Sequence, residues 1–343
     1  MDKHIKFEYL LDIPFFNTPV MDPVGGLQMR EDPLLRFSTY SIVARDPVSG
    51  QFGVAVQTHQ MCVGVVVPWL SPGLGALATQ ASSNIHFGPM GMALLAQGIT
   101  AERVVDALVA TDEGAHSRQL AVVDREGRAA AWTGERCIPV ADHRLGSGYS
   151  VQANMMLGPG VVGAMAEAYE NSQEDFAVRL LRALEAAQGL GGDIRGMQSA
   201  ALKVVEARAF DEEGRSHDMP LFDLRVDEHA NPLQELERLV RLRRAQWLNH
   251  QGFEHLEGEN RSDALKLWRQ ARDLAPELEE LGFWQAASLA DQDQPLDEAV
   301  AILKPILERE ANREDWIDLL RRIQQCGILE REGTAEALIK ALT

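Results

Sequence analysis

Hydrophobic and polar positions divide the chain into three stretches. Residues 1–36 show no stable period of 2 or 3.6 and carry the Pro-containing patches PFFNTP and MDPVGG, which predicts an irregular N-terminal arm. Residues 37–230 mix short apolar runs, typical of strands, with helical periods. In residues 231–343 the strand signals vanish, and Ala, Leu, Glu, Arg and Trp predict helices to the end. We therefore predict an arm followed by two domains.

The middle region predicts strands in hairpins and helices in pairs. Strands are predicted for YSIVA and FGVAVQT around the turn DPVSG, for VGVVVPW and LGALATQ, for RQLAVVD and AAAWTG around REGR, for SVQANMML, and for QSAALKVVEA and LFDLRV. Helices are predicted for GPMGMALLAQG, TAERVVDALVAT, VVGAMAEAYENS and DFAVRLLRALEAAQ. Hairpins with paired helices favour antiparallel sheets covered by helix layers. The predicted fold class is α+β, as a four-layer α/β/β/α sandwich.

The C-terminal stretch contains a repeat. The segments SDALKLWRQARDLAP and LDEAVAILKPILERE superpose with Ala264 on Ala299 and Leu267 on Ile302. The offset of 35 residues is close to the roughly 34 residues of a tetratricopeptide unit, which is a helix-turn-helix. Preceding and following segments supply further helices, which predicts three helix pairs. Because α-hairpins with small residues at the crossing are common, a plain helical bundle is the alternative.

Composition and charge exclude several classes. The chain holds 33 Lys and Arg against 51 Asp and Glu, a formal charge of −18, which argues against an electrostatic hold on nucleic acid or anionic lipid. The longest apolar run is broken by Pro68, Ser71 and Pro72, and the N-terminus lacks the pattern of a secretory signal. Three cysteines fit neither a disulfide framework nor a zinc site. We expect a cytoplasmic protein without metal or cofactor.

One glycine motif has the spacing of a dinucleotide-binding loop. Gly158, Gly160 and Gly163 spell GxGxxG between a predicted strand and a predicted helix, the position of a dinucleotide fingerprint. Pro159 removes a backbone donor where a pyrophosphate would bind, and no strand with an acidic ribose ligand follows at the required distance. The motif is better interpreted as a glycine-rich helix start packed close to a sheet.

Hydroxyl side chains gather at the start of the first long strand. Ser38, Thr39 and Ser41 directly follow the arm. A hydroxyl becomes a strong nucleophile only beside a base, and removal of the arm would supply one, because a new α-amino group with a pKa near 8 would stand next to its own side chain. Ser and Thr are also ordinary strand and turn residues, so a structural role is the alternative.

Other candidates follow from what acyl transfer needs. An oxyanion requires donors, which Asn154 in VQANMM or Asn84 in QASSN could provide. Arg45 and Asp46, at the end of the first strand, are candidates for binding substrate, and Thr79 and Gln80 for the pocket wall. Each has a structural alternative, such as Asp46 holding the amides of a hairpin turn.

Many ordered segments together resemble one known family. The run TYSIVARDPVSGQFGVAVQT, with VGVVVPW, GALATQASSN, FGPMGMALLAQG, AVVDREGRAAAWTGERC, SVQANMMLGP and GMQSAALKVV, is similar to the bacterial family called domain of unknown function 1028, over about residues 37–226. That family is placed among the Ntn-hydrolase-like proteins, which have an α/β/β/α sandwich and an N-terminal Thr, Ser or Cys nucleophile. The resemblance implies Thr39 as the nucleophile, cleavage between Ser38 and Thr39, and a homodimer.

Two functions remain open at this stage. The first is an Ntn-type hydrolase of a small non-peptide amide, with Thr39 as nucleophile, Asn154 or backbone amides at the oxyanion and no cofactor. The second is a non-catalytic ligand-sensing or oligomerisation scaffold whose helical tail binds a protein partner, which an intact arm would fit. The hydrolase has a small-molecule substrate; neither function involves nucleic acid or a membrane.

Overall fold

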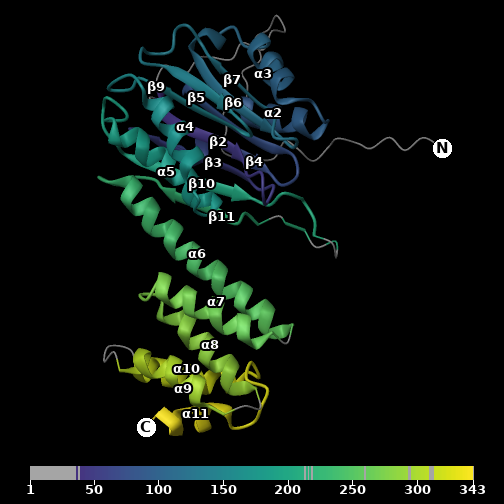
Figure 1. The fold of residues 1–343 in the computed structure, drawn as a ribbon, viewed down its shortest axis with the longest axis vertical. Helices are drawn as coiled ribbons and strands as arrows, with labels where there is room; N and C mark the ends of the chain where they lie inside the picture. Colours follow the sequence, from purple (N-terminus) through teal and green to yellow (C-terminus); the bar gives the residue numbers. More distant parts are fainter. Residues whose placement is uncertain are drawn as a thin grey trace, which may run out of the picture. The chain divides into compact units, whose positions relative to one another are not determined.

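The computed structural model shows antiparallel sheets and helices over residues 39–226, followed by helices up to residue 342 (Figure 1). The structure describes residues 36–37, 39–211, 214, 216–217, 219–258, 260–292, 295–308 and 313–342. The predicted arm, apart from Arg36, and the proposed cleavage point at Ser38 lie outside these residues. Residues Phe37–Thr343 form one compact unit, which is described here by itself.

One sheet contains the strand that begins with the candidate nucleophile. Its order is β11-β10-β3-β2-β9-β8, and the paired strands are antiparallel throughout. The bounds are β2 Thr39–Arg45, β3 Phe52–Thr58, β8 Asp142–Gly146, β9 Tyr149–Asn154, β10 Ser199–Val205 and β11 Phe222–Val226. The hairpin predicted around DPVSG is confirmed as β2 and β3, with Thr39 opposite Thr58.

A second sheet faces the first. In it β5 pairs with β4 and β6, and β6 pairs with β7, again antiparallel. The bounds are β4 Pro68–Ser71, β5 Gly75–Ser82, β6 Arg118–Asp124 and β7 Ala129–Thr133, and the two-residue strand β1 covers Arg36–Phe37. An apolar cluster with members from both sheets, including Val43, Val56, Ala78 and Val123, fills the space between them.

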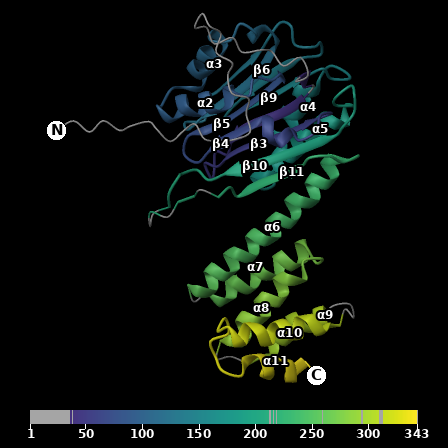
Figure 2. The ribbon, with the colours of Figure 1, turned by 180° about the vertical axis from the view of Figure 1, so that it is seen from behind.

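Helices cover the outer face of each sheet, and the two views show them from opposite directions (Figures 1 and 2). They are α2 Phe87–Ala96, α3 Ala101–Ala110, α4 Val161–Asn171 and α5 Phe176–Gly189. Leu77 of β5 and Leu120 of β6 pack against α2 and α3, while Ile42 of β2 packs against α4 and α5. The α+β class and all four predicted helices are confirmed.

Two strand predictions need correction. The run VGVVVPW is not one strand but the short helix α1 (Val63–Val66) followed by β4. Its apolar character comes from Val63 and Val67, which are buried in the cluster between the sheets without belonging to a strand. The sequence analysis also missed β8, because an edge strand with mostly exposed residues carries no apolar signal.

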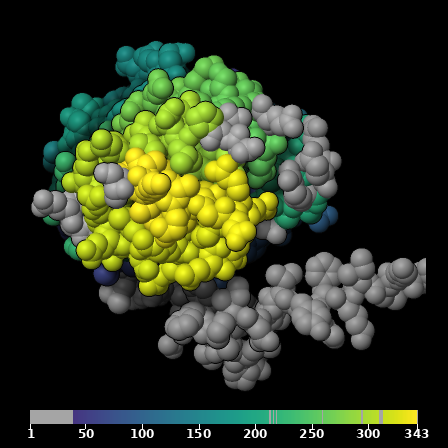
Figure 3. Space-filling model, turned by 90° about the horizontal axis from the view of Figure 1, so that it is seen from below, coloured from purple at the N-terminus to yellow at the C-terminus, as the bar shows by residue number. Residues whose placement is uncertain are grey.

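The C-terminal stretch is helical, as predicted. Its helices are α6 Pro232–Glu257, α7 Arg261–Leu274, α8 Glu279–Asp291, α9 Asp297–Leu307, α10 Arg313–Gln325 and α11 Thr334–Leu342. Contacts are most extensive within the predicted pairs α6/α7 and α8/α9. The aligned Ala264 and Ala299 are both buried. The last helices form the surface seen end-on in Figure 3, where the C-terminal residues are yellow.

The first turns of α6 pack against residues of the preceding strands and helices. Leu233, Leu236 and Val240 join the cluster that contains α4, α5, β10 and β11. Arg243 donates to the carbonyl oxygen of Leu221 at 2.7 Å, and Arg244 forms an ion pair with Asp175 at the start of α5.

In the part of the chain that the structure describes, no helix has the length and apolar character required to cross a lipid bilayer.

Candidate active site

Thr39 begins β2 and lies between the two sheets. It stands opposite Thr58 of β3 on one side and Asn154 of β9 on the other, and all three side chains are completely or almost completely buried. The Thr39 hydroxyl donates to Thr58 Oγ1 at 3.3 Å. Since opposite residues in an antiparallel pair point to the same face, this end of the inter-sheet space is polar while the rest is apolar.

Two primary amides converge on the backbone of Thr39. Gln80 Nε2, from β5, donates to the Thr39 carbonyl oxygen at 3.2 Å, and Asn154 Nδ2 donates to the same oxygen at 3.3 Å. Both nitrogens also donate to Oε1 of Gln119 in β6, at 2.7 and 3.0 Å. The two sheets are therefore joined at Thr39 by amide groups from both.

Gln119 carries the network outward. Its Nε2 lies within hydrogen-bond distance of three acceptors, which share its two hydrogens: the backbone oxygens of Asp142 and Ala153, at 3.2 and 3.0 Å, and the Thr133 hydroxyl, at 2.9 Å. The Thr133 hydroxyl lies 2.9 Å from His143 Nδ1. His143 is half-buried, and desolvation lowers the pKa of its imidazole, an effect that the nearby Asp142 carboxylate partly opposes.

A second branch runs along the inner face of the Thr39 sheet. Ser41 donates to Gln80 Oε1 at 2.6 Å and accepts from Gln152 Nε2 at 2.6 Å. Ser150 donates to Gln152 Oε1 at 2.8 Å. These four side chains are fully buried. Among the described residues, the hydrogen bonds of this network join hydroxyls, amides and backbone carbonyls, with one imidazole at the edge, and none of them involves a carboxylate or a cationic side chain.

This geometry limits what Asn154 can do. A primary amide has two hydrogens, and those of Asn154 face Gln119 Oε1 and the Thr39 carbonyl oxygen. Asn154 would reach an oxyanion only by releasing one of these acceptors. In this state of the protein Asn154 holds the backbone of Thr39, and the oxyanion role stays a prediction.

Arg45 and Asp46 lie far from Thr39. Arg45 ends β2 and Asp46 follows it, about 20 Å from Thr39 for a strand of this length. Asp46 accepts from the backbone and hydroxyl of Ser49 and forms an ion pair with Arg179 of α5 at 2.9 Å. These contacts are those of a turn clamped to a helix, and the structure does not bring the pair to the Thr39 end.

Thr79 and Asn84 are also separate from the network. Strand alternation turns Thr79 to the face of β5 opposite Gln80, where its hydroxyl donates to the backbone oxygen of Asn84 at 3.2 Å. Asn84 accepts from the backbone of His86 ahead of α2 and donates to Asp112 at 3.1 Å. Of the seven predicted site residues, the structure brings together Thr39, Gln80 and Asn154.

Sequence reasoning missed Gln119 and Gln152. Gln119 occupies an inward position of RQLAVVD, where the other inward residues, Ala121 and Val123, are apolar, whereas Gln152 lies in YSVQAN between the inward polar residues Ser150 and Asn154. A polar residue at a buried strand position was the available signal, since buried amides need dedicated partners. Among the described residues, no group of three or more His, Cys, Asp or Glu could hold a metal ion.

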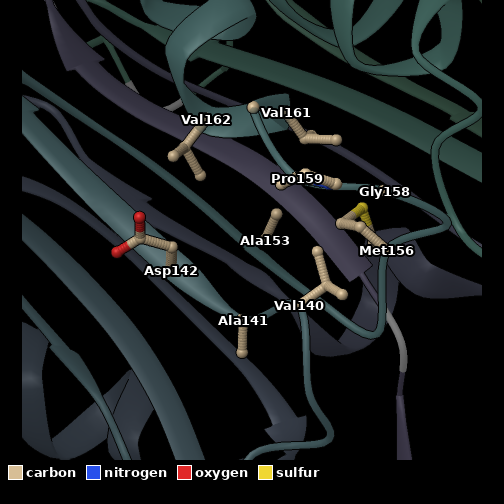
Figure 4. Close-up of a pocket in the computed structure, with 10 residues that line it drawn as sticks. Val140, Ala141, Asp142, Ala153, Met156, Gly158, Pro159, Val161 and Val162 are labelled. Atoms are coloured by element: carbon tan, nitrogen blue, oxygen red, sulfur yellow. The ribbon is translucent and has the colours of Figure 1, made fainter.

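A hollow of about 220 Å³ lies beside the same strands, on the face of β9 turned toward α4 (Figure 4). Figure 4 shows Val161 and Val162 of α4 on one side, and Ala153 and Asp142 on the other. Gly160 precedes α4 with φ of 89°. A Cβ at Gly158 or Gly163 would meet nothing within 4 Å, so the expected close packing of these glycines on a sheet is wrong.

Comparisons with known proteins agree with the resemblance seen in the sequence. The crystal structure of protein SPO2555 from Silicibacter pomeroyi, assigned to the DUF1028 family, is 33% identical with a TM-score of 0.53, over 60% of this chain and 88% of that one. No curated protein matches the chain significantly. The model of the family of unknown function DUF1028 matches residues 39–236, more than half of the chain. The match begins at Thr39. Because the match covers more than half of its residues, the chain belongs to the DUF1028 family.

Proposed function

We propose that the chain is an Ntn-type hydrolase of a small amide, with Thr39 as its nucleophile. The observation that carries the proposal is the placement of Thr39 as the first residue of an inner strand, held between two facing sheets by amides from both. The helices outside both sheets are the arrangement expected of an Ntn-hydrolase-like α/β/β/α sandwich. The family match, which starts at Thr39, also supports this position.

The reaction requires a free α-amine on Thr39. Once the Ser38–Thr39 bond is cleaved, the amine takes the proton from Thr39 Oγ1 as this oxygen attacks the substrate carbonyl carbon. The tetrahedral intermediate collapses to an ester on Thr39 as the C–N bond breaks, and the proton passes to the leaving nitrogen. Water, deprotonated by the same amine, then hydrolyses the ester and restores the threonine. No cofactor enters these steps.

The uncharged surroundings suit this base. With hydroxyls and amides as neighbours, the amine has no carboxylate among the contacts described above to stabilise its protonated form, and desolvation favours the neutral amine that accepts a proton. An amine with an ordinary pKa near 8 would thus be at least partly deprotonated near neutral pH. A substrate without net charge at the scissile group fits the same environment.

A scaffold is the second candidate function, and the complete burial of Thr39 favours it. In this alternative the amide network is structural, and helices α6–α11, as a tetratricopeptide-like array, bind a protein partner. The sandwich then serves ligand sensing or formation of a homodimer. Light scattering on the purified protein tests the dimer, and the catalytic test below separates the two functions.

The first experiment is intact-mass analysis with N-terminal sequencing of chain purified without an N-terminal tag. A chain beginning at Thr39 supports the hydrolase, and a panel of small amides is then screened for hydrolysis. In the Thr39→Ala variant, we expect kcat to fall by at least about 10³-fold with the fold retained. Thr111→Ala, whose hydroxyl only bonds the last turn of α3, is the matched control.

Two outcomes would overturn the hydrolase. If the purified chain still begins at Met1 and hydrolyses none of the amides tested, the scaffold becomes the supported function. Full activity in Thr39→Ala would remove Thr39 as nucleophile even if hydrolysis were observed.

A further inference from the structure

We propose that Gln119 is a positioning residue of the Thr39 site, which fixes the direction of the hydrogen bonds around Thr39. For the reaction itself, this inference rests on the hydrolase proposed above. The hydrogen-bond direction can be tested without any activity. Gln119 contacts neither a known substrate nor the Thr39 hydroxyl among the described contacts, so it acts through Gln80 and Asn154.

The orientation of the Gln119 amide follows from its backbone neighbours. One end of the amide faces the carbonyl oxygens of Asp142 and Ala153, at 3.2 and 3.0 Å. A carbonyl oxygen only accepts, so this end must be the Nε2 group. The other end, Oε1, then points toward Gln80 and Asn154. Two strands of one sheet thus orient a side chain that comes from the other sheet.

This orientation dictates those that follow. Because Gln119 Oε1 only accepts, Gln80 and Asn154 must turn their nitrogens toward it, and these nitrogens also reach the Thr39 carbonyl oxygen. Gln80 Oε1 then faces Ser41, which donates to it. A reversed Gln119 would set its oxygen against the carbonyl oxygens of Asp142 and Ala153 and its nitrogen against the nitrogens of Gln80 and Asn154, so no hydrogen bond would form at either end.

The same logic reaches the outer end of the network. Gln119 Nε2 cannot accept a hydrogen bond, so the Thr133 hydroxyl does not donate to it and directs its own hydrogen to His143 Nδ1, 2.9 Å away. This assigns the neutral Nε2–H tautomer to His143. A lowered imidazole pKa agrees with an acceptor role at Nδ1.

The Gln119→Glu variant tests the hydrogen-bond direction most directly, because an ionised glutamate has the shape of glutamine but no hydrogen to donate. A carboxylate at this site would face the oxygens of Asp142 and Ala153, whereas its protonated form could donate to one of them. The pKa of the carboxyl introduced by Gln119→Glu should therefore be raised in the folded protein. The stability of the variant is full below the pKa of an unfolded glutamate, about 4.3, and is lost as pH rises through the raised folded pKa.

The experiment compares wild type, Gln119→Glu and Gln119→Met on the full chain. Urea midpoints are measured between about pH 5.5 and 8.5, the range in which buried glutamates can titrate. We expect the Gln119→Glu midpoint, relative to wild type, to fall as pH rises, whereas that of Gln119→Met is lowered by the same amount at every pH. Gln97→Glu, at the exposed end of α2, is the control and should show no such loss.

Side-chain NMR supplies the direct readout. In wild type, the amide protons of Gln80 and Asn154 should exchange slowly and His143 should be the Nε2–H tautomer. Gln119→Met should speed the exchange of both amides, and Gln119→Glu should regain slow exchange at the acid end. Unchanged exchange in Gln119→Met, a pH-independent Gln119→Glu, or an Nδ1–H tautomer in wild type would each overturn the proposal.

Activity then separates this proposal from the proposed hydrolase. If wild type hydrolyses an amide, Gln119→Met should lose on the order of 10²-fold in kcat with KM little changed, and the kcat of Gln119→Glu, divided by that of wild type at the same pH, should rise toward acid pH. Full kcat in Gln119→Met would overturn the positioning role while the hydrolase stands. Absence of hydrolysis in wild type, with the stability and NMR results as expected, would remove the hydrolase and leave the assigned hydrogen-bond direction intact.

Discussion

The space between the two sheets differs sharply from one end to the other. Over most of its length Val43, Val54 and Val56 meet Ala78 and Val123 in an apolar core. At the Thr39 end, the same strands present hydroxyls and amides that are equally buried. Backbone pairing continues unchanged across both parts, so the difference lies in the side chains alone.

The two ends are stabilised in different ways. Apolar burial contributes roughly 25 cal/mol per Å² and tolerates small shifts, whereas buried amides contribute little net free energy and depend on every partner being present. An apolar core would be easier to build at both ends. The polar end therefore tolerates small shifts and substitutions less well than the apolar end. Such a cost in robustness is expected where buried side chains serve a function.

The largest expected effect comes from the apolar end. Phe52, at the end of this space furthest from Thr39, is fully buried in the apolar cluster. Phe52→Ala should lower the free energy of unfolding by about 3–5 kcal/mol through lost transfer free energy and a cavity. Urea unfolding measures the loss. Hydrolytic activity at temperatures where the variant stays folded should persist, and a selective loss of activity would show that the ends are coupled.

A smaller loss, with a different signature, is expected at the polar end. Gln80→Met removes the acceptor of the Ser41 hydroxyl and one of the two donors to Gln119 Oε1, which should cost about 1–3 kcal/mol. Adding Gln119→Met and Asn154→Leu should cost less than the sum of the three single changes, because acceptors and donors disappear together. Strictly additive losses in urea unfolding would contradict a connected network.

The smallest effect concerns the edge of the network. Burial lowers the pKa of His143, so the folded state favours its neutral form. The resulting stability is full above the ordinary histidine pKa of about 6.5 and is lost as pH falls from there toward the lower folded pKa. Urea midpoints of wild type and His143→Gln should therefore diverge less at pH 5.5 than at pH 8. An equal difference at both pH values would contradict the prediction.

The sequence was informative where burial is apolar. The β2–β3 hairpin and helices α2–α5 carry clear periods, and all were predicted. It failed where tertiary context decides. Val63 and Val67 are apolar because they are buried between the sheets, not because they form a strand, and the exposed residues of β8 give no signal although its backbone holds Gln119.

The site was predictable only in part for a related reason. Thr39 stood out as a hydroxyl at a strand start, and Asn154 and Gln80 were chosen because acyl transfer needs an oxyanion donor and a pocket wall. Register decided the others: a shift of one residue separates Thr79 from Gln80, and the length of β2 separates Arg45 from Thr39. Pairings such as Gln119 with Asn154 join two sheets, and no local pattern reports them.

Helix α6 gives the chain a mechanical property. Its first turns, with Leu233, Leu236 and Val240, belong to the apolar cluster that contains α4, α5, β10 and β11, and its later turns pack against α7. At 1.5 Å per residue the helix is about 39 Å long, a single rod embedded at one end. Force applied to the tail would reach β10 and β11 directly, and a chain shortened to end near Val226 would leave the apolar surface of α5 and these strands open to water.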